Sequence, residues 1–265
     1  MIIDLHNHTP RCNHAKGSME EFVLEAIKQK VKIFGFSDHA PLNWDDKHRM
    51  DADEMEAYEN EFFTLKAKYA DQITLLLGYE ADYLPTKTIE RVFEREVDYL
   101  IGSVHFVDLW GFDDPESVFD AFGSDEFSKR GLDEVWRSYF AAIADMAASG
   151  RFNIVGHLDL IKIFGHYEGK KSDDAVEKAL AAIKEADMAI EINASGWRKP
   201  VNEQYPSIEI LKLAYSLNIP ITFGSDAHAV DHIGYKRAAA YELARSVGYK
   251  EAAVFKDKKK QMMKI

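Results

Sequence analysis

The chain has 265 residues, and its hydrophobic fraction of 46% is sufficient for the core of one α/β barrel. Its formal net charge of −12 at pH 7 argues against a protein that tracks along nucleic acid. No stretch approaches the roughly 18 apolar residues that a membrane-spanning helix needs.

Short apolar runs alternate with amphipathic segments along the whole chain. They predict seven strands: Ile2–His6, Ile33–Ser37, Ile73–Tyr79, Tyr99–Val104, Phe152–Val155, Ala189–Ile192 and Ile219–Phe223. Between them, Ser18 opens a capping-box pattern with Glu21. Asp133–Ser149 and a segment that begins at Ser172 carry helical apolar stripes. The alternation predicts a single α/β domain over residues 1–265, with a parallel barrel favoured over an open sheet.

Residues 106–132 interrupt this alternation. The segment is acidic and aromatic and follows directly after His105. In a barrel, the loops at the carboxyl ends of the strands surround the active site. We therefore expect an insertion that covers the site. At the other end of the chain, the basic segment Lys256–Lys264 is expected to be a solvated tail.

Seven of the ten histidines lie where predicted strands end. They occur in Asp4-Leu5-His6-Asn7-His8, at His14, and in Ser37-Asp38-His39, Ser103-Val104-His105, Gly156-His157 and Ser225-Asp226-Ala227-His228. Glu80, in Gly78-Tyr79-Glu80-Ala81-Asp82, lies at another strand end. Successive residues of a strand point to opposite faces, so His6 should share a face with His8, and Asp226 with His228.

A single histidine at a strand end is more often an ordinary surface residue than a metal ligand, but a barrel brings all of these ends to one rim. Imidazole and carboxylate ligands suit zinc, iron or manganese, and clustered thiolates are absent from the sequence. Nine ligands exceed the needs of one ion and match two to three. Asp4, Asp38 and Asp159 lie near these ligands, and each could orient a ligand or serve the local backbone.

The order of these motifs resembles the polymerase and histidinol phosphatase (PHP) superfamily, and within it the monofunctional histidinol-phosphate phosphatases. More specific marks are Thr9–His14, Ser37–Pro41, and Ser103–Phe106 followed by Trp110–Asp113. The resemblance covers essentially the whole chain. It implies a distorted (β/α)7 barrel.

The resemblance also implies a trinuclear centre. One ion would be held by His6, His8, Glu80 and Asp226, a second by His14, His39 and His228, and a third by His105, His157 and the other oxygen of Glu80. The implied reaction is hydrolysis of L-histidinol phosphate to L-histidinol and inorganic phosphate by a metal-activated hydroxide. Asp226 or His228 would pass a proton to the leaving alcohol.

Four further residues are candidates for substrate binding. The resemblance implies that Arg198 grips the phosphate and that Lys162 is a second basic contact, although each could be a surface cation. From the composition of the insertion, we hypothesise that Asp113, with Asp108 as the alternative, pairs with the substrate amine. Trp110, with Phe112 as the alternative, would cover its imidazole.

Two alternative functions are considered. The same centre could serve another PHP phosphoesterase, either a broad phosphomonoesterase or an exonuclease, but the acidity of the chain argues against a nuclease. A non-catalytic metal-binding module should have lost ligands, and none is missing here. We therefore expect a small phosphate monoester as the partner, with no nucleic acid and no membrane, and a monomer or homodimer. Cys12 is the only cysteine and Met1–Asp4 leads straight into a strand, which favours a cytoplasmic protein.

Overall fold

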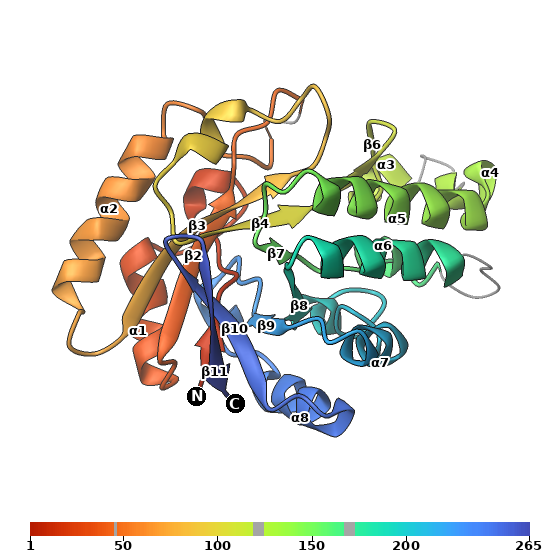
Figure 1. Cartoon of the computed structure of the whole chain (residues 1–265). Coiled ribbons are helices and arrows are strands. Elements are labelled where there is room, and N and C mark those ends of the chain that lie inside the picture. The colour runs from red at the N-terminus through yellow and green to blue at the C-terminus, as the bar shows by residue number, and fades with distance from the viewer. Residues whose placement is uncertain (45–46, 119–124, 167–172) are drawn as a thin grey trace.

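The computed structural model describes residues 1–44, 47–118, 125–166 and 173–265. Within these ranges, seven parallel strands form one sheet in the order β1-β2-β3-β4-β7-β8-β9 (Figure 1). The strands are β1 (Ile3–Asp4), β2 (Ile33–His39), β3 (Thr74–Asp82), β4 (Tyr99–Ser103), β7 (Ile154–Val155), β8 (Ala189–Asn193) and β9 (Ile221–Gly224). Each strand falls on one of the seven predicted apolar runs.

The two edges of this sheet meet, which closes it into a barrel. The backbone N–H of Leu5 donates to the carbonyl oxygen of Phe223 at 2.9 Å. Beyond the strand ends, Asn7 and Ala227 form a parallel bridge, and the N–H of His8 donates to the Ala227 carbonyl at 3.0 Å. The seam therefore runs into the segments that carry predicted metal ligands. The prediction of a distorted (β/α)7 barrel is confirmed.

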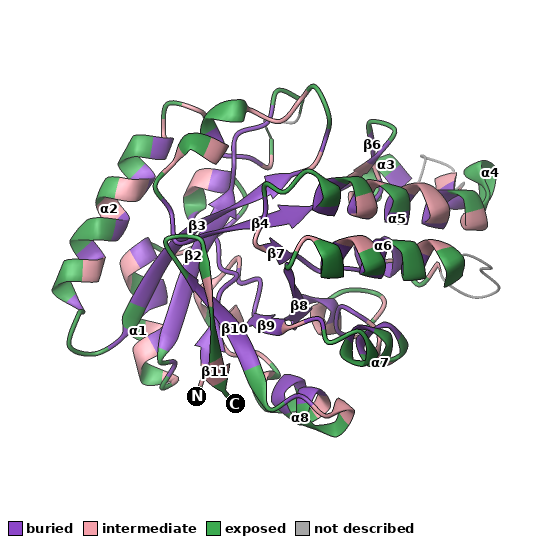
Figure 2. Cartoon of the chain, viewed as in Figure 1, coloured by how far each residue is buried: buried purple, intermediate pink, exposed green. Residues whose placement is uncertain are grey.

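Inside the barrel, the Tyr99 side chain leaves no room for a Cβ at two strand positions. The strands are buried almost throughout (Figure 2), as expected for a parallel sheet covered by helices. The hydroxyl of Tyr99 donates to the carbonyl oxygen of Leu5 at 2.6 Å. A Cβ at Gly35 would lie 2.0 Å from that hydroxyl oxygen, and one at Gly78 would lie 2.7 Å from the same ring. Glycine is needed at both positions because of this close packing.

Helices surround the barrel with their apolar faces inward (Figure 2). The longer ones are α1 (Met19–Lys28), α2 (Met55–Lys68), α5 (Leu132–Ala148), α6 (Asp173–Glu185), α7 (Ile208–Ser216) and α8 (Arg237–Val247). The predicted capping box is present at the start of α1. The Ser18 hydroxyl accepts from the backbone N–H of Glu21, and the Glu21 carboxylate accepts from the backbone N–H of Ser18. Helix α5 matches the predicted helix within one residue at each end. Ser172 lies outside the described residues, and α6 is described from Asp173.

The predicted insertion forms small elements between β4 and α5. They are the hairpin β5 (Phe106–Val107) and β6 (Trp110–Gly111), and the short helices α3 (Pro115–Val118) and α4 (Glu126–Arg130). Residues 119–124 of the insertion lie outside the described residues. Short 3-10 turns in the described ranges are η1 (Pro10–Cys12), η2 (Glu90–Glu94), η3 (Leu160–Lys162), η4 (Ser195–Arg198) and η5 (Val230–His232).

The C-terminal segment differs from the expected solvated tail. It forms an antiparallel hairpin of β10 (Glu251–Lys256) and β11 (Lys259–Lys264). Although the lysines are largely exposed, the preceding run Ala252–Phe255 is buried against the rest of the protein, which fixes the hairpin in place. None of the helices in the described parts of the chain has the length and apolar character needed to cross a bilayer.

Replacing Gly35 with alanine should destabilise the barrel. The added methyl group would meet Tyr99 inside the core, and overpacking of this kind typically costs about 1–3 kcal/mol. The free energy of unfolding measured in urea should fall by this amount. Gly111→Ala is the matched control, because its Cβ would find no atom closer than 3.5 Å. Equal stability of the two variants would contradict the packing argument.

Candidate metal centre

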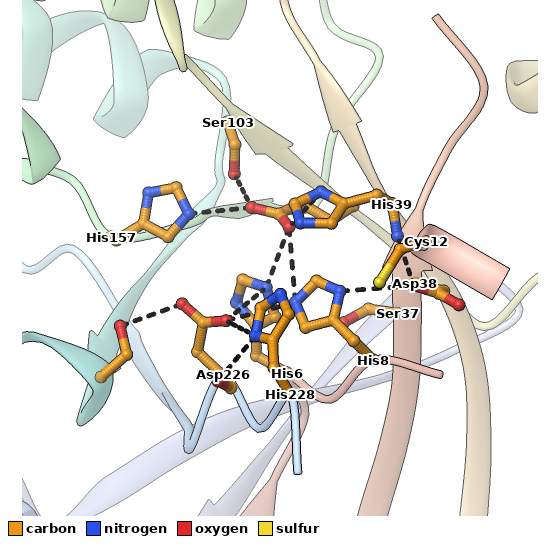
Figure 3. Close-up of polar contacts among 12 residues, drawn as sticks. His6, His8, Cys12, Ser37, Asp38, His39, Ser103, His157, Asp226 and His228 are labelled. Atoms are coloured by element: carbon orange, nitrogen blue, oxygen red, sulfur yellow. Dashed lines mark hydrogen bonds and ion pairs between the residues drawn. The ribbon is translucent and has the colours of Figure 1, made fainter. Parts of the chain in front are cut away.

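The nine predicted ligands converge at the carboxyl ends of the barrel strands. They are His6, His8, His14, His39, Glu80, His105, His157, Asp226 and His228. In Figure 3, the labelled side chains of His6, His8, His39, His157, Asp226 and His228 are gathered around a common centre. The residues predicted to share one rim of the barrel therefore do lie together there.

One oxygen of Glu80 faces three imidazoles. Its Oε2 lies 3.0 Å from His39 Nδ1, 3.2 Å from His6 Nε2 and 3.6 Å from His8 Nε2. Glu80 lies near the end of β3, His39 ends β2, and the other two residues follow β1. The end of β2 and the segment that follows β1 thus bring three imidazoles to one buried carboxylate oxygen on β3.

The other oxygen of Glu80 faces a second pair of histidines. Its Oε1 lies 2.8 Å from His157 Nε2 and 3.7 Å from His105 Nε2. The hydroxyl of Ser103 donates to the same oxygen at 2.6 Å, as Figure 3 shows. Because its two oxygens face different sets of imidazoles, Glu80 can bridge two cations.

Asp226 is fixed from one side and open on the other. Its Oδ2 accepts hydrogen bonds from Ser195 Oγ at 3.0 Å and Asn193 Nδ2 at 3.2 Å. Its Oδ1 lies 3.2 Å from His8 Nε2 and 3.3 Å from His228 Nδ1. Asp226 and His228 do meet, but not by the predicted strand alternation. The strand β9 ends at Gly224, and Asp226 has a left-handed backbone with φ of 49°.

His14 completes a third group at the edge of the centre. Its ring centroid lies 4.5 Å from that of His228 and 5.3 Å from that of His39. The backbone carbonyl of Cys12 lies 2.8 Å from His14 Nδ1, which leaves Nε2 for a ligand. Burial lowers the pKa of His14 to about 3 and that of His228 to about 4, so both rings are neutral at pH 7. Neutral imidazole is the form that binds metal ions.

The residues present fit divalent metal ions. Within the described residues, His6 Nε2, His8 Nε2 and Glu80 Oε2 are buried atoms without a hydrogen-bond partner. Leaving such groups unsatisfied is costly, and they face one another. A cation among them would satisfy all three. The chain therefore contains clusters of histidine, glutamate and aspartate that are able to hold metal ions.

Several residues behind the ligands were not predicted as their partners. Glu191 Oε1 lies 2.8 Å from His6 Nδ1, and Asp82 Oδ1 lies 2.7 Å from His105 Nδ1. A carboxylate on the far nitrogen orients the imidazole and fixes its tautomer. Burial alone would raise the pKa of Asp82, but the charges of Arg49 and His105 hold it at about 2. Strand alternation could have indicated Asp82, because it lies two residues after Glu80 on β3.

The three aspartates predicted to lie near ligands have different partners. Asp38 Oδ1 lies 3.4 Å from His8 Nδ1, as expected for an orienting residue. Asp4 instead accepts hydrogen bonds from the backbone and side chain of Ser225, which fastens β1 to the loop that carries Asp226. Asp159 forms a buried ion pair with Lys162. The Asp38 carboxylate thus lies beside the imidazole of a predicted ligand, whereas Asp4 meets a predicted ligand at the backbone of His6.

A cavity of about 790 Å³ opens onto the ligands. Seven of the nine ligands line it, whereas His6 and His8 are fully buried. Among the predicted substrate-binding residues, Arg198 and Asp113 line the cavity wall. The wall also contains residues that were not predicted to bind metal or substrate, namely Trp44, Lys47, His48, Arg49, Phe106, Leu109, Ser195, Lys199 and His232.

Lys162 is not among the residues that line this cavity. It is buried, and its Nζ donates to Glu203 Oε2 at 2.6 Å and to the Gln204 carbonyl at 2.9 Å. Asp159 Oδ2 lies 3.0 Å from the same nitrogen. Three acceptors thus occupy the ammonium group, and the structure gives Lys162 a role in holding two loops together. Its predicted contact with phosphate has no support from this geometry.

Trp110 is likewise not among the residues that line the cavity, although its neighbours Leu109 and Gly111 line it. Its indole N–H donates to the carbonyl oxygen of Ser117 at 3.0 Å, and its ring packs against Phe127 with centroids 5.0 Å apart. The side chain therefore stabilises the insertion. Among the described residues of the insertion, Phe106 rather than Trp110 is the aromatic residue at the cavity wall.

The PHP domain family matches residues 4–195, which is more than half of the chain. The chain belongs to the PHP family. Among its relatives, a protein of Deinococcus radiodurans named "probable histidinol-phosphatase" is 37% identical over 93% of this chain and 94% of its own length. The histidinol-phosphatase of Bacillus subtilis is 30% identical over 90% of this chain and 98% of its own length.

The PHP fold is also found by comparison with solved structures. A histidinol phosphate phosphatase from Lactococcus lactis, complexed with zinc, L-histidinol and phosphate, has a TM-score of 0.80 to this chain at 23% identity. The match covers 98% of both chains. The resemblance that the motifs indicated is therefore confirmed, and so is the barrel type.

Replacing Glu191 with glutamine should weaken metal binding. The change keeps the size of the side chain but removes the charge beside His6 Nδ1, and outer partners of this kind typically contribute 10–100-fold to metal affinity. Competition with a chromogenic chelator should show a loss of Zn²⁺ affinity in this range. Glu177→Gln, on the exposed side of α6, should bind Zn²⁺ as the unmodified protein does. Unchanged affinity in the Glu191 variant would refute this role.

Proposed function

We propose that this chain hydrolyses L-histidinol phosphate to L-histidinol and inorganic phosphate. The observation that carries the proposal is the convergence of imidazole and carboxylate groups on a cavity that also exposes Arg198 and Asp113. Similarity to histidinol-phosphatases over 93% of the chain supports the same substrate.

We propose three cation positions, each formed by one set of the predicted ligands. The first cation would be held by His6, His8, Glu80 Oε2 and Asp226, and the second by His14, His39 and His228. The third would be held by His105, His157 and Glu80 Oε1. Mixed imidazole and carboxylate ligands suit Zn²⁺, iron or Mn²⁺, and we propose that two to three ions bind. When bound, such ions activate water at neutral pH and compensate charge on the phosphoryl oxygens.

Arg198 is the proposed phosphate-binding residue. Its Nη2 donates to the carbonyl oxygens of Ser225 at 2.9 Å and Asp226 at 2.8 Å, which holds the guanidinium at the cavity wall. Its Nη1 is buried and has no acceptor among the described residues. A phosphoryl oxygen would supply that acceptor, and the planar guanidinium suits it.

Departure of the alcohol requires a proton at its oxygen. Asp226 and His228 both line the cavity, with side chains 12% and 24% exposed, so either can reach a leaving group there. We therefore propose that one of them takes a proton from the attacking water and passes it to the leaving alcohol. Asp226 would also act as a metal ligand, with Ser195 and Asn193 keeping its carboxylate in place.

The remaining wall of the cavity suits the amine and imidazole of the substrate. Asp113 and Asp114 line it and provide acceptors for an ammonium group. Phe106 and Leu109 provide apolar contact for a ring, in place of the predicted Trp110. The insertion would thus supply specificity for the organic part of the substrate.

The composition of the chain supports a proposal for its compartment and partners. We propose a cytoplasmic monomer or homodimer that acts on a small molecule. The net charge of −12 disfavours binding to nucleic acid, and the only cysteine is buried and unpaired.

Metal content and phosphate release test the activity directly. Protein purified without chelator should contain two to three ions per chain and release phosphate from histidinol phosphate. Glu80→Gln should lower kcat by more than the roughly 100-fold typical of outer metal-site residues, because Glu80 contacts both groups of imidazoles. Near-normal turnover in this variant would rule out the shared role of Glu80. Faster release from nucleotides, sugar phosphates or DNA ends would favour a broad phosphomonoesterase or an exonuclease instead.

Asp113→Ala should separate recognition of the amine from the chemical step. Loss of one partly exposed ion pair contributes about 1 kcal/mol, so KM for histidinol phosphate should rise several-fold. KM for p-nitrophenyl phosphate, which lacks an amine, should not change. Asp108→Ala is the control, since Asp108 belongs to the same insertion but is exposed and does not line the cavity. Equal effects of Asp113→Ala on both substrates would disprove amine recognition.

A further inference from the structure

Arg49 is a buried arginine beside the metal centre that no sequence motif indicated. It lies between β2 and α2 and is only 4% exposed. Its Nε donates to Asp82 Oδ2 at 2.7 Å, and its Nη2 donates to Asp82 Oδ1 at 3.1 Å. The two parallel hydrogen bonds hold both oxygens of Asp82, so the carboxylate cannot rotate freely.

Asp82 transmits this constraint to a ligand. Its Oδ1 lies 2.7 Å from His105 Nδ1, so the ionised carboxylate accepts the Nδ1 proton. The Nε2 atom of His105 is thereby left without a proton, and it lies 3.7 Å from Glu80 Oε1. In this tautomer His105 can donate its Nε2 lone pair to a cation beside Glu80.

The backbone around Arg49 is tied to two other ligand segments. Its carbonyl oxygen accepts a hydrogen bond at 2.9 Å from Asn13 Nδ2, next to His14. The N–H of Met50 donates to the carbonyl of His39 at 3.3 Å. Segments that follow β1 and β2 are thus connected through Arg49 to β3 and the end of β4.

We propose that Arg49 is a positioning residue of the metal centre. It holds Asp82 so that His105 presents Nε2 to the cation shared with His157 and Glu80. The inference rests on the cation positions of the proposed function. Because Arg49 acts through Asp82 on one of the three groups, its loss should weaken one bound ion and leave the others in place.

The test compares Arg49→Met with Arg95→Met. Arg95 is a matched control: it makes the same bidentate pair with Glu59, which bonds Tyr79 and no predicted ligand. Each protein is loaded with Mn²⁺ without substrate, and ions per chain and the Mn²⁺ dissociation constants are measured. Arg49→Met should raise the dissociation constant of one ion about tenfold or more, whereas Arg95→Met should keep all constants. Equal losses of Mn²⁺ affinity in both variants would mean that the effect is a general destabilisation, and would overturn the proposal.

Two further variants control for misfolding and test whether Arg49 acts through Asp82. Arg49→Lys keeps the positive charge but cannot donate two parallel hydrogen bonds to Asp82. Its metal affinity should therefore lie between those of Arg49→Met and the unmodified protein. Asp82→Asn combined with Arg49→Met leaves no unpaired buried charge. It should bind metal no more weakly than the worse single variant, since both changes act on the same contact. Full affinity in Arg49→Met, or additive losses in the double variant, would overturn the proposal.

The same preparations keep the two proposals apart. If the unmodified protein binds its ions but does not release phosphate from histidinol phosphate, the proposed substrate fails and the role of Arg49 is still measured by metal affinity. If the unmodified protein is active and Arg49→Met retains every ion at normal affinity, only the inference about Arg49 fails.

Discussion

The structure of the site depends on one buried carboxylate. Glu80 presents its two oxygens to imidazoles from opposite sides, and the distances of 2.8 to 3.7 Å leave positions between them for cations. This arrangement exists only because the barrel closes. The seam between β1 and β9 brings the first histidine motif against Asp226, more than two hundred residues away in sequence. The closing hydrogen bonds and the site are therefore one structural unit.

Around this unit, two ligands are restrained by carboxylates that do not line the cavity. Glu191 orients His6, and Asp82 orients His105 and is in turn held by Arg49. Buried charges are favourable only when each has a partner. These outer residues therefore contribute to both the stability of the fold and the affinity for metal. The barrel core supports the arrangement from beneath, where Tyr99 connects neighbouring strand ends.

The sequence predicted the barrel and the convergence of the nine ligands because both follow from local signals. Apolar runs mark strands, and parallel strands share one rim. Local signals do not give the direction of a side chain. Lys162 and Trp110 are next in sequence to residues that line the cavity. Neither residue lines it, because hydrogen bonds hold both side chains against other parts of the protein. Arg49 had no motif at all, since its role depends on a contact with Asp82 that only the folded chain creates. The strand alternation predicted for Asp226 and His228 did not apply, because the strand had already ended.

The left-handed backbone at Asp226 has an evolutionary consequence. L-residues seldom adopt a φ of 49°, and aspartate and asparagine tolerate it better than most others. Glutamate could offer the same carboxylate but would not suit this backbone as well. Mutational drift at this position is thus confined by conformation as well as by chemistry. A descendant that gave up this ligand would most easily pass through asparagine, which keeps the turn while losing the charge.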